Sequence, residues 1–170
     1  MILATNRLIL RELNENDAKD MYLLNADPEV IRYTGDDPFE SVDAARIFLM
    51  NYSDYVRNGM GRWAVIEKEN QRIIGWCGLK RHDDGMGDLG YRFLKSAWGK
   101  GYATESSLGC LIYGFQTLQL PQIIARVDPA NIASVRVIEK LGFSFWKTDE
   151  CHGLANAGIY RLNATEFRDE

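Results

Sequence analysis

The sequence predicts one α/β domain in which helices pack on a mixed β-sheet. The chain has 170 residues, which is enough for one hydrophobic core and too few for two comfortable ones. Strand-like apolar runs alternate along it with segments of helical period. No repeat, low-complexity tract or linker interrupts it. We therefore expect residues 1–170 to form a single domain.

Composition and charge argue against several classes of protein. The hydrophobic fraction of 46% and the charged fraction of 26% are ordinary for a globular protein, and the net charge of −4 offers no basic field for nucleic acid. No apolar run approaches the ~20 residues of a membrane span, and the N-terminus lacks signal-peptide features. Three cysteines without a CxxC pair fit a reducing compartment. We expect a cytoplasmic monomer or homodimer, with no nucleic-acid or membrane partner.

The N-terminal third is predicted to contain one strand and two helices. Residues 7–13 are predicted to form a strand, and Asn14 or Asn16 can cap the helix that follows. A short helical turn is expected over 29–33. Ser41 can cap a second helix, which we expect to continue until Asn58 and Gly59 end it.

The remaining elements follow from apolar runs separated by turn residues. Asn131 can cap the last helix, and Gly142 suits the left-handed position that ends it. We expect strands over residues 62–67, 72–80, 88–94, 123–127, 143–148 and 158–163, and helices over 103–118 and 133–141.

The most informative motif is the glycine-flanked turn Trp98-Gly-Lys-Gly-Tyr-Ala-Thr-Glu105, between a strand and a helix. Free N–H groups and the helix dipole at such a position bind anions, above all phosphates. A P-loop is excluded, because Leu94 stands where its first glycine belongs and Gly101 follows the lysine. A dinucleotide fingerprint is excluded, because Thr104 replaces its third glycine.

A third interpretation rests on a resemblance to the GNAT superfamily of N-acetyltransferases. Residues 98–103 match the last three places of its Arg/Gln-x-x-Gly-x-Gly/Ala signature, with Trp98 in the first place. That substitution is typical of the branch that resembles ribosomal-protein-alanine N-acetyltransferases. Residues 5–11, 89–94 and 131–143 resemble the opening strand, the central strand and the acetyl-CoA-side helix of the same branch.

The resemblance implies a mostly antiparallel central sheet flanked by helices, with a cofactor cleft between two splayed central strands. It also implies N-acetyltransferase activity with acetyl-CoA as co-substrate and no metal. The pyrophosphate would lie on the glycine turn, and the pantetheine along the preceding strand. The cofactor-binding residues expected on this basis are Tyr91, Arg92, Phe93, Leu94, Trp98, Gly99, Lys100, Gly101, Tyr102, Ala103, Thr104 and Asn131.

Two residues are the catalytic candidates. Many members of the superfamily use a tyrosine to protonate the CoA thiolate, but Ile138 occupies that place here, so Ser134 becomes the proposed donor. Asp88, at the head of the central strand, is the candidate general base, with Asp83 and Asp84 behind it. A turn and a strand start explain these aspartates equally well.

Histidine and cysteine chemistry is not expected to contribute. His82 and His152 have no metal-ligand spacing with Cys151 or Asp83, so we expect surface histidines. Cys77 and Cys110 fit buried structural positions better than nucleophilic ones. We therefore expect direct attack in a ternary complex and not an acetyl-cysteine intermediate.

The acceptor stays open at this point. Either a peptide N-terminal α-amine or a small-molecule amine is compatible with the sequence, and aromatic residues of the N-terminal third are expected to form core, with some lining the acceptor site. The alternative is a non-catalytic acyl-CoA-binding sensor or structural protein of the same fold. Transfer of another acyl group, such as succinyl, is a third hypothesis.

Overall fold

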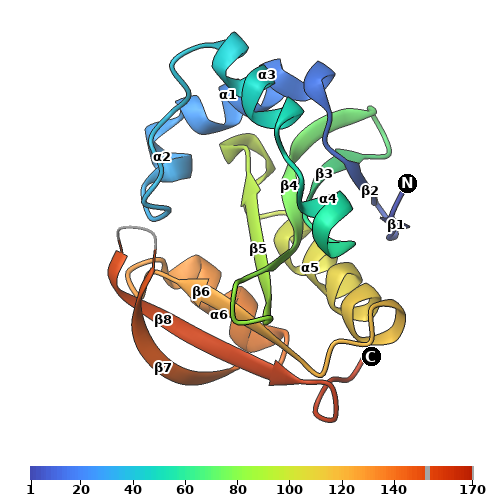
Figure 1. Cartoon of the computed structure of the whole chain (residues 1–170), viewed down its shortest axis with the longest axis vertical. Coiled ribbons are helices and arrows are strands. Elements are labelled where there is room, and N and C mark those ends of the chain that lie inside the picture. Colours follow the sequence, from blue (N-terminus) through green and yellow to red (C-terminus); the bar gives the residue numbers. More distant parts are fainter. Residues whose placement is uncertain (152–153, 170) are drawn as a thin grey trace.

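The computed structural model describes residues 1–151 and 154–169, which form one open eight-stranded sheet (Figure 1). The strand order is β1-β2-β3-β4-β5-β6-β8-β7, and every neighbouring pair is antiparallel except β5 and β6. The strands are β1 (Leu3–Ala4), β2 (Leu8–Glu12), β3 (Arg62–Glu67), β4 (Arg72–Arg81), β5 (Gly87–Phe93), β6 (Gln122–Val127), β7 (Ser144–Cys151) and β8 (Leu154–Asn163). This is the mixed, mostly antiparallel sheet that the resemblance implied.

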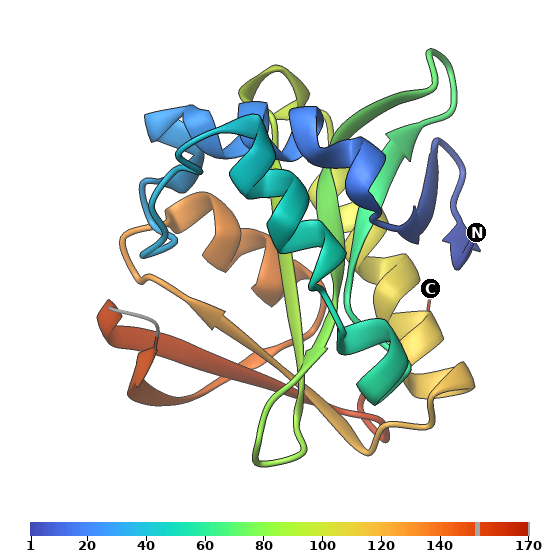
Figure 2. The same cartoon turned by 45° about the horizontal axis from the view of Figure 1, so that its top comes forward.

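Helices cover both faces of this sheet, and Figure 2 shows α1 and α3 on one side of β4 and β5, with α5 on the other. None of the helices in residues 1–151 and 154–169 is long and apolar enough to cross a membrane. The helices are α1 (Ala18–Ala26), α2 (Pro28–Ile31), α3 (Val42–Met50), α4 (Asp54–Asn58), α5 (Tyr102–Ile112) and α6 (Ile132–Lys140).

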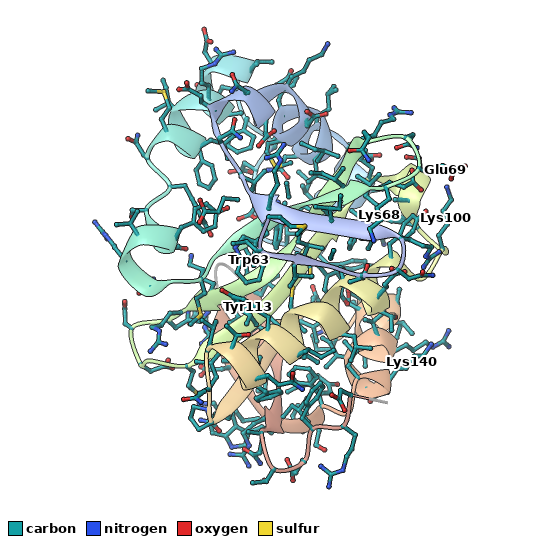
Figure 3. All side chains as sticks on the ribbon, turned by 90° about the vertical axis from the view of Figure 1, so that its right-hand side faces the viewer. Trp63, Lys68, Glu69, Lys100, Tyr113 and Lys140 are labelled. Atoms are coloured by element: carbon teal, nitrogen blue, oxygen red, sulfur yellow. The ribbon has the colours of Figure 1, made fainter. Side chains whose placement is uncertain are left out.

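Each face of the sheet has its own apolar core. The larger core lies against α5 and α6, where Trp63 is 1% exposed and meets the Tyr113 ring edge-on with centroids 5.5 Å apart (Figure 3). The smaller core joins α1, α2 and α3 through Leu24, Val30 and Leu49. Because each layer has a separate core, the sheet between them is held from both sides.

The predicted elements are found in order, with two differences in the helices. The expected helix 41–58 is two helices, because Asn51, Ser53 and Asp54 favour a cap and a turn over a helix interior. The expected helix 103–118 is α-helical only to Ile112 and continues as the π-helical segment Tyr113–Thr117. The expected strand over 7–13 is β2, and β1 before it was not predicted.

The parallel pair β5 and β6 creates the cleft. Their pairing is limited to Gly87 with Ile123 and Asp88 with Ile124, after which the strands diverge (Figure 1). On its other edge β5 stays paired with β4 from Gly87 to Phe93. The part of β5 beyond Asp88 therefore presents one main-chain edge to the cleft.

Gly78 permits the close pairing of β3 and β4. A Cβ added there would lie 2.0 Å from the Gly61 carbonyl oxygen, which is main chain and cannot rotate away. We predict that Gly78→Ala lowers the free energy of unfolding by about 3 kcal/mol, because the strands must separate. Chemical denaturation measures this loss.

The matched control is Gly85→Asn, in an exposed turn where nothing lies within 4 Å of the added Cβ and φ is +83°. Asparagine tolerates that left-handed conformation, so the expected loss is less than about 1 kcal/mol. Equal losses in the two variants would contradict the packing argument.

Candidate active site

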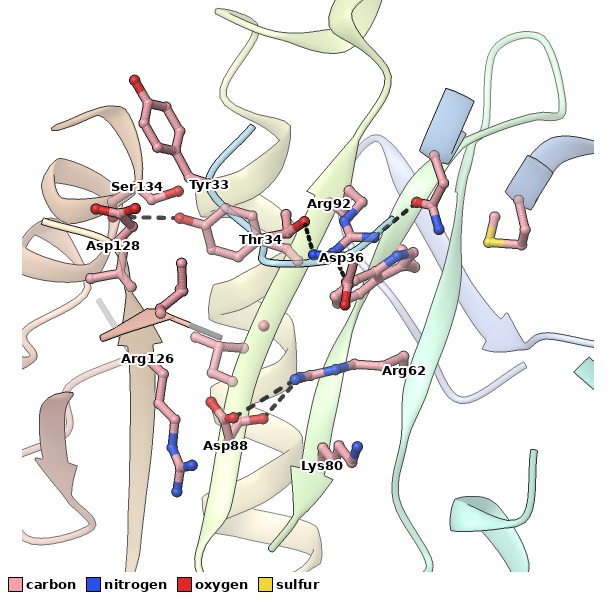
Figure 4. A pocket seen from close by; sticks show the side chains of 18 of the residues that line it. Tyr33, Thr34, Asp36, Arg62, Lys80, Asp88, Arg92, Arg126, Asp128 and Ser134 are labelled. Atoms are coloured by element: carbon pink, nitrogen blue, oxygen red, sulfur yellow. Dashed lines mark hydrogen bonds and ion pairs between the residues drawn. The ribbon is translucent and has the colours of Figure 1, made fainter. Parts of the chain in front are cut away.

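A cavity of about 490 Å³ opens where β5 and β6 diverge. Its wall combines the cleft-facing side chains of β3, β4 and β5 with the segment between α2 and α3 and with the start of α6 (Figure 4). Of the predicted site residues it brings together Asp88, Tyr91, Arg92, Asn131 and Ser134. The predicted residues outside its wall are Phe93, Leu94, Trp98, Gly99, Lys100, Gly101, Tyr102, Ala103 and Thr104.

The glycine turn forms a second part of the site, at the far end of β5. Gly99 and Gly101 have φ of +72° and +79°, a backbone conformation that favours glycine. No side chain caps the N-terminus of α5, whereas the Ser134 N–H of α6 donates to Asn131 Oδ1 at 3.2 Å. The first-turn N–H groups of α5 are thus left to a ligand, and an anion suits them best.

Arg7 holds this turn from the loop between β1 and β2, a contact that the sequence did not predict. Its Nη1 donates to the Lys100 carbonyl at 2.9 Å, and its Nε to Glu105 Oε2 at 2.7 Å. Glu105 also accepts from the Thr5 hydroxyl at 2.6 Å. Burial raises the pKa of Glu105, but these hydrogen bonds outweigh it and hold that pKa below its usual range. The turn is therefore anchored to β2 by a charged network.

The side chains of the turn itself point elsewhere. Lys100 is exposed (Figure 3), and its main chain makes the contact with Arg7. Trp98 is 47% exposed, and its indole N–H donates to the Phe93 carbonyl at 3.0 Å. Tyr102 is buried and hydrogen-bonded to Glu67. The side chains of Trp98 and Tyr102 are thus engaged within the protein, while the glycines leave the main chain of the turn accessible.

Tyr91 and Ser134 approach each other across the cleft between β5 and β6. The Tyr91 hydroxyl donates to the Ser134 carbonyl oxygen at 3.5 Å, and both residues line the cavity. Burial raises the pKa of Tyr91 to about 12, so the phenol stays protonated at neutral pH. A side-chain hydrogen bond between Ser134 and Tyr91 partly offsets this rise in the pKa of Tyr91. Two hydroxyl groups therefore lie beside the buried Ile138, which also lines the cavity.

Asp88 is buried and shared between two partners at the base of β5. His82 Nε2 lies 2.7 Å from its Oδ2, and Arg62 Nη2 lies 3.8 Å from the same oxygen. The expectation of a surface His82 is wrong, because its side chain is 15% exposed and bonded to Asp88. The β4–β5 hairpin brings the two together across its turn, a fold-back that composition alone does not reveal. His152 lies outside the described residues.

The other acidic candidates do not reach the cavity. Asp83 and Asp84 are exposed in the hairpin turn, and Asp84 Oδ1 accepts from the Met86 N–H at 2.9 Å. Among residues 1–151 and 154–169, no cluster of three or more His, Cys, Asp or Glu side chains could hold a metal ion. Of the three acidic candidates from the sequence, Asp88 is thus the one that lines the cavity, and it does so together with His82.

Arg62 forms part of the cavity floor and was also missed by the sequence analysis. Its Nη1 donates to the carbonyl oxygens of Gly78 and Asp88, both at 3.0 Å. A Cβ on Gly90 would lie 2.7 Å from the Arg62 guanidinium carbon, so this glycine makes room for the side chain. Arg62 also lies over the Trp76 ring, 5.1 Å from its centroid. Its position is thus fixed by three neighbouring strands.

The aromatic residues of the N-terminal third and the cysteines divide between the cavity wall and the cores. Tyr33, Phe39, Phe48 and Tyr52 line the cavity, while Tyr22 and Tyr55 pack in the two cores. Cys77 and Cys110 are fully buried with their sulfur atoms 3.6 Å apart, away from the cavity wall.

Comparison with known proteins identifies the family. The model of the acetyltransferase (GNAT) domain matches residues 7–144. An uncharacterized N-acetyltransferase p20 of Bacillus licheniformis is 35% identical over 144 residues, covering 83% of this chain and 81% of that protein. Among solved structures, a GNAT-family acetyltransferase from Bacillus anthracis superposes with a TM-score of 0.82 at 25% identity, covering 96% of this chain and 99% of that one.

A spermidine N-acetyltransferase from Vibrio cholerae, solved with CoA and spermine, has the same fold, with a TM-score of 0.78 at 21% identity over 94% of this chain and 97% of that one. The matched domain, the relatives and the splayed sheet agree: this chain belongs to the GNAT family and is an N-acetyltransferase.

Proposed function

We propose that this protein transfers the acetyl group of acetyl-CoA to a primary amine bound in the cavity. One observation carries the proposal. The uncapped N-terminus of α5 lies at one end of β5, and the buried pair Asp88 and His82 lies at the other. From Asp88 to Leu94 an extended strand covers about 20 Å. An extended cosubstrate with an anionic end and a reactive end fits that separation.

The residues for binding are those whose main chain is left unpaired. The amides at the start of α5, with Gly99 and Gly101 giving close access, would bind the pyrophosphate. The edge of β5 from Tyr91 to Leu94 would bind the pantetheine through main-chain groups. The thioester then reaches the cavity near Ser134 and Asp88.

The reaction removes two protons from the acceptor ammonium and supplies one to the thiolate. The acceptor ammonium gives its first proton to the Asp88–His82 pair, and the free amine attacks the thioester carbonyl carbon. The C–S bond then breaks, the thiolate takes a proton from the Ser134 hydroxyl, and the second proton of the acetylated nitrogen restores that hydroxyl. An α-amine with pKa near ~8 costs about 1 kcal/mol to deprotonate at pH 7, while a lysine amine near ~10.4 costs about 4–5 kcal/mol.

Direct attack in a ternary complex is the route that the cavity favours. The two cysteines whose side chains the structure describes are fully buried and do not line it, so neither is placed to carry an acetyl group. The amine and the thioester can instead meet in the same cavity.

Ser134→Ala is predicted to lower kcat about tenfold or more, with little change in the KM for acetyl-CoA, because the serine acts on the leaving thiolate and not on the bound cosubstrate. Steady-state kinetics measures both constants. An unchanged kcat would rule out this donor, and a loss in Tyr91→Phe alone would assign the proton to the phenol.

Asp88→Asn and His82→Gln are each predicted to lower kcat/KM for the amine about 100-fold and to flatten the acidic limb of its pH profile, because both remove the proton acceptor. Asp84→Asn is the matched control, since Asp84 belongs to the same hairpin and is exposed outside the cavity. Acidic limbs that match the wild type in both variants would contradict the assignment.

Arg7→Met is predicted to raise the KM for acetyl-CoA about tenfold and to change kcat less than twofold, because the turn loses the hydrogen bond that fixes Lys100. Arg57→Met, on the exposed face of α4, is the control. The idea fails if Arg7→Met folds normally and binds acetyl-CoA with wild-type affinity in calorimetry.

A further inference from the structure

The net charge of the cavity wall differs from the net charge of the whole chain. The chain carries a net charge of −4, whereas the wall has as many cationic as acidic side chains, apart from His82. The cationic ones are Arg62, Lys80, Arg92 and Arg126, and the acidic ones are Asp36, Asp37, Asp88 and Asp128.

Two of the acidic side chains are already neutralised by these cations. Arg92 Nη2 lies 2.6 Å from Asp36 Oδ2, and Arg62 lies beside Asp88 (Figure 4). A polyamine brings several positive charges, each of which needs its own acidic partner once water is removed. Asp37 and Asp128 are the wall carboxylates outside these two ion pairs, and they are fewer than the positive charges of spermidine.

The floor of the cavity, in contrast, has cationic capacity to spare. Lys80 stands opposite Asp88 in the β4–β5 register, and it faces the same side of the sheet as Arg62 (Figure 4). Its half-buried ammonium has no hydrogen bond or ion pair within residues 1–151 and 154–169. Arg62 directs Nη1 to two carbonyl oxygens, and its Nη2 remains at 3.8 Å from the Asp88 carboxylate.

We propose that the acceptor is a small amine that carries a carboxylate on the same molecule, as an α-amino acid does. This inference rests on the proposed function and names its acceptor class. The carboxylate binds Lys80 and the Arg62 guanidinium, while the amino nitrogen faces the Asp88–His82 pair. The ammonium form is then attracted by Asp88, and the amine formed there attacks the thioester.

The charge and the shape of the wall both suit such an acceptor. The carboxylate of the acceptor carries one negative charge. It would be balanced by the Lys80 ammonium and by the Arg62 guanidinium, whose own charge is already partly balanced by Asp88. The opposite wall is apolar and aromatic, with Met21, Phe39, Phe48 and Leu49, and can receive an apolar side chain.

The test compares acceptors that differ only at the carboxylate. CoA release gives kcat/KM for phenylalanine, phenylalaninamide and phenethylamine, for leucine, leucinamide and isoamylamine, and for spermidine and a peptide amide with a free N-terminus. The amides have the more easily deprotonated amine, so a preference for the acids cannot arise from amine basicity. The acids are expected to exceed the amides and the plain amines by about 10- to 100-fold.

Variants of the cavity floor test whether Lys80 and Arg62 cause the preference for acids over amides. Lys80→Met, and Gly90→Ala through displacement of Arg62, are each expected to lower the ratio of acid to amide at least fivefold. Lys19→Met, on the exposed face of α1, is the control and keeps the wild-type ratio. The ratio is measured within each variant, so a general loss of activity does not imitate the effect.

Each result decides one proposal or both. Transfer to amides, plain amines, spermidine or the peptide at rates equal to or above those of the acids overturns the carboxylate assignment, while acetyl transfer itself stands. A wild-type preference that Lys80→Met and Gly90→Ala both retain overturns the role of the floor. Failure of every amine to release CoA overturns the proposed function and this inference together.

Discussion

The early end of the pairing between β5 and β6 is the constraint on which the site depends. Two strands that run parallel and share only two residue pairs must separate, and β5 then keeps hydrogen-bonding partners on its β4 edge alone. Buried main-chain groups need partners, so the open edge calls for a bound molecule or water. The same divergence admits α6 on one side and the loop before α3 on the other, which together close the cavity.

Two arginines, Arg7 in the loop before β2 and Arg62 in β3, stabilise the ends of this cleft. Arg7 ties the glycine turn to β2 through Glu105 and the Lys100 carbonyl, and Arg62 lies flat across the floor because Gly90 has no side chain. Both act through fixed guanidinium geometry, which directs several N–H groups at once. Each end of the cleft is therefore held by a residue distant in sequence from the motif that it supports.

Charged side chains divide the cavity into the hydrogen-bonded pair Asp88 and His82 and a cationic floor of Lys80 and Arg62. Asp88 belongs to both, because it accepts from His82 and compensates Arg62. Removing Asp88 would leave Arg62 less compensated as well as removing a proton acceptor. The acetyl-transfer chemistry and the acceptor selection that we propose are thus coupled through one buried carboxylate.

The sequence by itself determined the order of the elements, the glycine turn at α5, the cap at Asn131 and the family, because these depend on local periodicity and on residues close in the chain. It placed Asp88 and Ser134 as candidates, and their roles stay predictions. Only the tertiary structure joined His82 to Asp88, Arg7 to Glu105 and Arg62 to Gly90. His82 meets Asp88 across the β4–β5 hairpin, Arg7 reaches α5 from the loop before β2, and Arg62 extends from β3 to β5. The packing of distant segments, and not sequence distance, decides which of these side chains meet.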